Sequence, residues 1–219
     1  MNSLVSNRLV RGAVFVCLLA LAWPARTHTV WIEPSGEGVI IRFAEPDGKF
    51  EKSPGHLDSL SEPVAFSVVT NSPLWIDAPK RADHFAMPGA SSTNAAGCES
   101  VFTVRGGRKP HFYARWQPAG ESVAKPMLTF DLVPTGKPGE VRVHFRGRPL
   151  GGLKATLRTP DNQERELAVD AEGFIRFTSE QPGQHLLTIA HYRENLGGFH
   201  GGRAYEQTSH NTALTWRQP

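Results

Sequence analysis

The segment VRVHFR, residues 141–146, alternates strictly between apolar and polar side chains. Successive side chains of a β-strand point to opposite faces of the sheet, so this alternation is typical of a strand with one buried face. Similar short segments recur at Val101–Val104, Phe112–Trp116 and Phe174–Phe177, between Gly and Pro turn signals. No segment keeps helical spacing for three turns. We therefore predict an all-β fold of two antiparallel immunoglobulin-like or transthyretin-like sandwiches.

Residues 1–27 have the composition of a secretory signal peptide. Arg8 and Arg11 precede an uninterrupted apolar run of 12 residues, 12–23, which is shorter than the ~20 residues that span a bilayer. Ala25 and Thr27 are small residues at the −3 and −1 positions of a cleavage site before His28. We therefore expect export to the periplasm or the cell exterior, with residues 28–219 as the mature protein and no membrane span in that part.

The charge and cysteine content change when this leader is removed. The chain has 24 Lys+Arg and 21 Asp+Glu, and the leader contains Arg8, Arg11 and Arg26 but no acidic residue, which leaves 21 of each sign. A neutral mature protein gives no reason to expect a nucleic-acid partner. Cys17 lies in the leader, so Cys98 alone remains and no internal disulfide can form. The hydrophobic core must therefore hold the fold together.

A change of composition divides the mature chain into two parts. The segment QPAGESVAKP, residues 117–126, is small, polar and rich in proline, as linkers are. We predict an N-terminal β domain over residues 28–119 and a C-terminal transthyretin-like β-sandwich over residues 127–219. In the first of these, the polar segments 45–62 and 87–98 are predicted to be long loops.

Several short motifs carry a resemblance to a known family. They are HTVWIEP at 28–34, LVP at 132–134, GRPLGG at 147–152, DAEG at 170–173, PGQHLLT at 182–188, GGRAY at 201–205 and SHNTALT at 209–215. With these motifs the chain resembles the bacterial exported domain-of-unknown-function family 4198 over most of the mature part. Residues 141–192 are also similar to transthyretin-like and carboxypeptidase-regulatory sandwiches. The resemblance implies a β-sandwich fold. Because some relatives are linked to periplasmic nickel or cobalt uptake, it also implies a metal ion or a membrane transporter component as partner.

The predicted mature N-terminus is the most specific candidate for a metal site. There, His28 would offer its α-amine and its ring Nδ1 to one ion, and a second histidine would complete a three-nitrogen site suited to Cu(II). We favour His210 as the second ligand, because a strand gives it a fixed direction. His200 in a glycine-rich loop and His84 beside Asp83 are the other candidates, whereas an ordinary histidine at a frayed terminus is the competing interpretation.

Signals of enzymatic activity are weak. The sequence contains no Gly-x-Ser-x-Gly, no His-Glu-x-x-His and no phosphate-binding loop. This favours a non-enzymatic periplasmic binding or accessory protein that handles Cu, Ni or Co through His28. A structural or protein-interaction sandwich without metal is the first alternative, and a copper-dependent oxidase of the histidine-brace type is the second. The sequence leaves these three functions open.

Overall fold

The computed structural model describes residues 28–36, 38–45, 49–118, 124–178 and 180–219. The predicted signal peptide and residues 119–123 of the predicted linker lie outside the described residues. The regular elements of the described chain are β-strands and one short 3-10 helix, η1 (His56–Ser59), without an α-helix. The prediction of an all-β fold is therefore confirmed.

No helix in the described part of the chain is long and apolar enough to cross a membrane.

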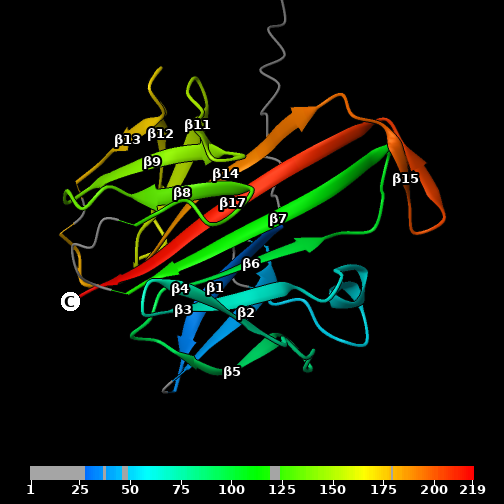
Figure 1. Ribbon diagram of the computed structural model, residues 1–219, viewed down its shortest axis with the longest axis horizontal. Coiled ribbons are helices and arrows are strands. Elements are labelled where there is room, and N and C mark those ends of the chain that lie inside the picture. Colours follow the sequence, from blue (N-terminus) through cyan, green and yellow to red (C-terminus); the bar gives the residue numbers. More distant parts are fainter. Residues whose placement is uncertain (1–27, 37, 46–48, 119–123, 179) are drawn as a thin grey trace, which may run out of the picture.

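The strands form three main sheets, and Figure 1 shows the longest of them crossing the molecule diagonally between the other two. One sheet has the order β1 (Thr29–Ser35), β2 (Gly38–Ala44) and β5 (Phe85–Ser91). The long sheet has the order β12 (Glu164–Ala168), β11 (Lys154–Arg158), β14 (Gly183–Glu194), β17 (Gln207–Gln218), β7 (Arg108–Gln117), β6 (Ala96–Val101), β3 (Val64–Val69) and β4 (Ser72–Ile76). The third contains β8 (Phe130–Pro134), β9 (Glu140–Phe145), β10 (Arg148–Pro149) and β13 (Phe174–Arg176). A separate hairpin is formed by β15 (Gly198–His200) and β16 (Arg203–Tyr205).

A parallel pairing of β7 with β17 joins the two predicted parts of the chain. Its register places His111 opposite His210 and Tyr113 opposite Thr212. The other pairings between the described strands are antiparallel, as predicted. The segments 28–119 and 127–219 thus share one continuous sheet in addition to their covalent connection.

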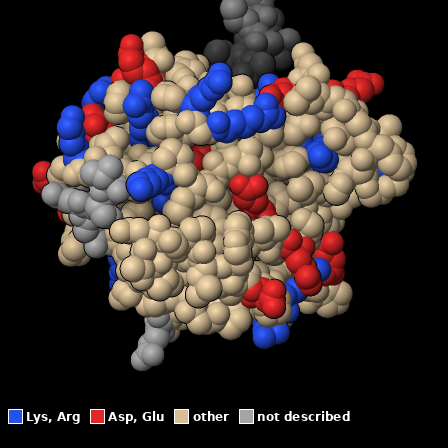
Figure 2. Space-filling model, in the orientation of Figure 1, with Lys and Arg blue, Asp and Glu red and all other residues tan. Residues whose placement is uncertain are grey.

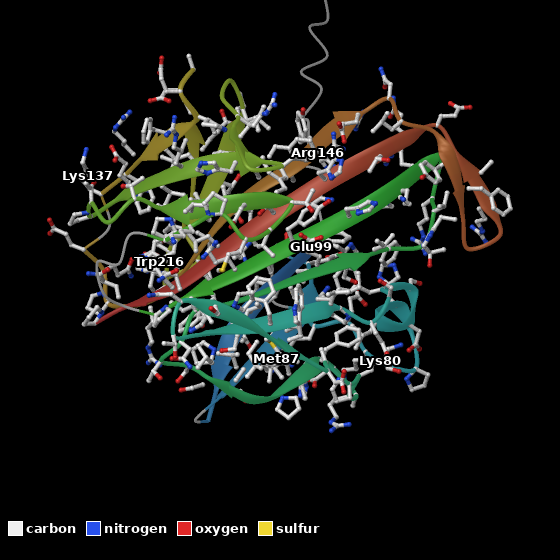
Figure 3. All side chains as sticks on the ribbon, viewed as in Figure 1. Lys80, Met87, Glu99, Lys137, Arg146 and Trp216 are labelled. Carbon is white, nitrogen blue, oxygen red and sulfur yellow. The ribbon has the colours of Figure 1, made fainter. Side chains whose placement is uncertain are left out.

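Two hydrophobic clusters form on the two faces of this long sheet, because the side chains of its strands alternate. Phe112 and Trp116 of β7 belong to the cluster under β1, β2 and β5, whereas Tyr113 belongs to the cluster under β8 and β9. Met87 lies in the first cluster, and Trp216 packs against the second. Figure 3 shows these two labelled side chains well apart in the molecule.

The prediction of a loop over residues 87–98 is wrong, because β5 and β6 occupy most of it. Packing requires one of the small residues that suggest a loop. At Gly97 a Cβ atom would lie 2.4 Å from Cζ of Phe66, whose ring covers the strand. Cys98 beside it is fully buried in the first cluster, and this burial raises the pKa of its thiol well above the ordinary value.

The free edge of the long sheet at β4 is apolar. Leu74 and Trp75 are 58% and 65% exposed, and Val64 and Val69 of the neighbouring β3 are exposed as well. Figure 2 shows a broad uncharged area over this part of the molecule, with small mixed groups of charged side chains elsewhere on the same face. An exposed edge strand offers unpaired backbone groups to another chain.

Candidate metal site

One group of side chains with metal-ligand spacing occurs among the described residues, and it consists of His28, Glu51 and His56. Their ligand atoms all lie within 4.8 Å of one another. Glu51 Oε1 is 2.5 Å from His28 Nε2 and 3.1 Å from His56 Nδ1. A single carboxylate oxygen therefore lies against one nitrogen of each imidazole, and all three side chains are partly buried.

The end of β2 positions two of the three residues. His28 immediately precedes β1, whose register places Thr29 opposite Ala44. Beyond Ala44 the chain returns to form a bridge between Ala44 and Phe50, and the backbone N–H of Glu51 donates a hydrogen bond of 2.9 Å to the carbonyl of Phe43. His28 and Glu51 are thus fixed to the same end of one hairpin.

The third residue, His56, is held by the loop that opens η1. The carboxylate of Asp58 accepts hydrogen bonds from Lys80 Nζ at 2.9 Å, from the backbone N–H of Gly55 at 2.9 Å and from Ser53 Oγ at 2.8 Å. These bonds, with that of Lys80 the strongest, lower the pKa of Asp58 to about 2. Figure 3 shows Lys80 at the side of the molecule where this loop lies. The network gives His56 a fixed backbone position.

The two histidines determine the ionisation of Glu51. Burial acts to raise the pKa of its carboxyl group, but the hydrogen bonds and charges of His28 and His56 outweigh burial, so the pKa lies below its ordinary value. Glu51 is therefore a carboxylate at neutral pH. This is the form that coordinates a cation, since metal ligands must be deprotonated.

The two histidines also line an open pocket of about 510 Å³. Its apolar wall is aromatic: the ring centroid of Phe43 lies 5.1 Å from that of His28, and the ring centroid of Phe102 lies 5.1 Å from that of His56. His56 Nε2 is buried and has no hydrogen-bond partner within the described part of the chain. Two of the three side chains of the group thus line a pocket whose volume is that of a small-molecule site.

This arrangement suits a transition-metal ion. Two imidazole nitrogens and one carboxylate oxygen are donors that Zn²⁺, Ni²⁺, Cu²⁺ and Fe²⁺ accept. In a tetrahedral site with bonds of about 2.1 Å the donors are about 3.4 Å apart, so the 2.5 Å contact between His28 and Glu51 would open by about 1 Å. Three protein ligands leave at least one coordination position free.

The structure does not bring His210 to His28. His210 Nδ1 is 2.9 Å from the hydroxyl of Tyr113, and its Nε2 is 2.9 Å from Glu194 Oε2, so both ring nitrogens have partners. Its strand neighbours Ser209 and Asn211 line the pocket beside His28. Because alternate residues of β17 face opposite sides of the sheet, His210 points into the other layer. His210 does lie on a strand, β17, which fixes its direction, but the sequence does not show which layer it enters.

The other two histidines predicted as metal ligands also lie outside the group. His200 is exposed on β15. His84 Nδ1 is 2.7 Å from Asp83 Oδ1, and this carboxylate also pairs with Arg42 at 2.9 Å, but no third ligand joins them among the described residues. The residues that sequence reasoning missed are Glu51 and His56. The available signal was their occurrence within one predicted long loop, residues 45–62.

His111 is half-buried, and its Nε2 is buried. Its ring centroid lies 5.5 Å from that of His210. Burial, helped by the charge of Lys109, lowers the pKa of His111 to about 4, and burial lowers the pKa of His210 in spite of its bond to Glu194. Both rings are therefore neutral in the folded protein near neutral pH.

We expect this pair to make the protein acid-sensitive. In the unfolded chain these histidines bind protons near pH ~6.5, whereas in the folded protein their rings bind protons only at lower pH. The free energy of unfolding is therefore highest above pH ~6.5, and it decreases as the pH falls toward about 4. For His111 the loss should reach at most about 3 kcal/mol. In urea denaturation at several pH values, His111→Asn should reduce the fall in unfolding free energy, and the exposed His200→Asn should not. Equal pH profiles for His111→Asn and the wild type would contradict the burial of this ring.

Comparison of the chain with protein-family models found no match, and comparison with curated proteins found none either.

Proposed function

We propose that residues 28–219 form an exported, non-enzymatic binding or accessory protein that holds one divalent transition-metal ion through His28, Glu51 and His56. The observation that carries the proposal is the convergence of His28 Nε2, Glu51 Oε1 and His56 Nδ1 within 4.8 Å of one another. The leader-like composition of residues 1–27 supports a location in the periplasm or outside the cell.

The donor set is compatible with nickel, cobalt or copper as the cargo. Imidazole nitrogens bind these ions well, and among divalent first-row ions copper is expected to bind most tightly. Zinc and ferrous iron are compatible with the same donors, so the ions must be compared directly. If the ion is delivered to a transporter, the partner is a membrane transporter component, as the resemblance of the sequence implies.

The geometry distinguishes this site from a histidine brace. A brace uses Nδ1 of the first histidine together with its α-amine, whereas here it is Nε2 of His28 that faces Glu51. The three-residue site therefore does not need a free amine. A copper-dependent oxidase of the brace type does need a free amine, so the addition of one residue ahead of His28 distinguishes the two kinds of site.

Calorimetric titration with Ni²⁺ tests the proposal. We expect the processed protein to bind about one equivalent, with affinity falling as the pH drops through the imidazole range near ~6.5, because the ligands must be deprotonated. A form with one alanine ahead of His28 should bind within about threefold of this affinity, and His200→Ala, a matched control, should be unchanged. Loss of binding in the extended form would replace the three-residue site with a brace.

A protein-interaction module without metal is the second candidate function. The exposed apolar edge at β4, with Leu74 and Trp75, is the observation that favours it. This function predicts no binding of Ni²⁺, Co²⁺, Cu²⁺ or Zn²⁺ at micromolar concentration. The same titration therefore decides between the two candidates.

A further inference from the structure

The pocket beside His28 and His56 is lined by three arginines, Arg105, Arg108 and Arg193. None of the three forms an ion pair with a carboxylate within the described part of the chain. Five other arginines do, namely Arg42, Arg115, Arg146, Arg158 and Arg176. No Asp or Glu is among the described residues that line this pocket. The three guanidinium groups that line the pocket are therefore without a carboxylate partner within the described part of the chain.

The fold brings these arginines together from separate strands. Arg105 and Arg108 flank the turn before β7, where their backbone N–H and C=O groups pair in both directions at 3.0 Å. Arg193 lies on β14, opposite Ser209 of β17, and Ser209 is itself opposite Pro110 of β7. Arg108 and Arg193 therefore come from the two strands that flank β17, and both line the same pocket.

The remaining wall of the pocket is aromatic. The ring centroid of Phe43 lies 5.5 Å from that of Phe102 and 5.7 Å from that of Phe112. All three rings line the pocket, and the guanidinium of Arg105 lies 5.5 Å from the ring centroid of Phe102. A volume of about 510 Å³ is within the range of pockets that hold small molecules. The pocket thus offers cations and aromatic faces to the same ligand.

We infer that this pocket binds an organic anion with an apolar body, of the aromatic carboxylate class, next to the metal ion. Its apolar part packs against the phenylalanine rings, and its carboxylate pairs with the arginines, whose planar guanidinium groups match carboxylate geometry. The metal half of this inference rests on the proposed function: a bound cation adds positive charge to the same pocket and strengthens anion binding. The arginine half is independent of the metal.

Titration with benzoate, an aromatic carboxylate, tests the inference on nickel-loaded and on metal-free protein. Benzoate is expected to bind at about one equivalent, and more tightly to the nickel-loaded form. Acetate, which lacks the ring, and benzyl alcohol, which lacks the charge, should both bind much more weakly. The double variant Arg105→Gln/Arg193→Gln should weaken benzoate binding at least about tenfold, since charge-assisted hydrogen bonds are lost. Arg148→Gln, at an exposed arginine of β10, is the matched control and should change nothing.

The outcomes separate the pocket from the metal site. Two results would overturn the inference and leave the proposed function intact. In both, nickel binds normally, but benzoate either produces no heat of binding or binds the wild type and the double variant with equal affinity. If nickel itself does not bind, the proposed function fails. In that case the benzoate titration of the metal-free protein still tests whether the pocket binds an aromatic carboxylate. A tenfold loss of benzoate affinity in the double variant supports this binding, and equal affinities overturn it.

Discussion

Replacing Asp131 with alanine is expected to lower the free energy of unfolding by about 3–5 kcal/mol. Asp131 forms a two-point ion pair with Arg115, at 2.8 Å to Nε and 2.6 Å to Nη2, and the two side chains are 0% and 1% exposed. The same carboxylate accepts hydrogen bonds from the backbone N–H groups of Met127 and Leu128. Its removal leaves a guanidinium buried between β7 and β8 without a counter-charge. Urea denaturation of both proteins measures the loss.

Two comparisons identify the cause of that loss. Lys154→Ala removes an exposed ion pair with Glu166 and should change stability by at most about 1 kcal/mol. The double variant Arg115→Met/Asp131→Leu removes both buried charges and should recover most of the stability that Asp131→Ala loses. A loss in Asp131→Ala no larger than that in Lys154→Ala would contradict the buried pair.

Nickel at about one hundred times its dissociation constant is expected to stabilise the processed protein by about 2.7 kcal/mol. For a chain of this size that corresponds to a rise in melting temperature of about 5–10 °C. His56→Ala and Glu51→Gln each remove one of three ligands, so both should abolish most of the rise. Differential scanning fluorimetry with and without the ion measures it.

The matched control for this effect is His200→Ala, because His200 is an exposed histidine outside the group. It should keep the full rise in melting temperature. An equal rise in His56→Ala and in the wild type would place the bound ion at another site. The comparison is made as a difference between metal-loaded and metal-free forms, so a change in intrinsic stability caused by the substitution does not affect it.

Local side-chain alternation predicted individual strands well. The alternating segments 141–146, 112–116 and 174–177 coincide closely with β9, part of β7 and β13, whereas 101–104 lies mostly beyond the end of β6. The pattern failed where a distant contact decides the residue type: Gly97 is small because the ring of Phe66 lies over it, and the sequence of β6 alone does not show this. The parallel pairing of β7 with β17 joins residues about a hundred positions apart, and no local signal specifies it.

The candidate site was predictable only at its first residue. The predicted cleavage site identified His28 as a candidate ligand, and the structure places His28 in the group of three. Glu51 and His56 reach it through the bridge between Ala44 and Phe50 and through the loop fixed by Asp58, which are tertiary features. His210 was preferred as a partner because a strand fixes its direction, and that direction proved to be the opposite face of the sheet.

The position of a bound ion tests the central claim most directly. Crystals of the processed protein grown with Ni²⁺ and measured at the nickel absorption edge would locate the ion by its anomalous scattering. The three-residue site predicts one strong peak at about 2.0–2.3 Å from His28 Nε2, Glu51 Oε1 and His56 Nδ1. A peak at the α-amine and Nδ1 of His28, a peak away from Glu51 and His56, or no peak at full nickel occupancy in solution would contradict it.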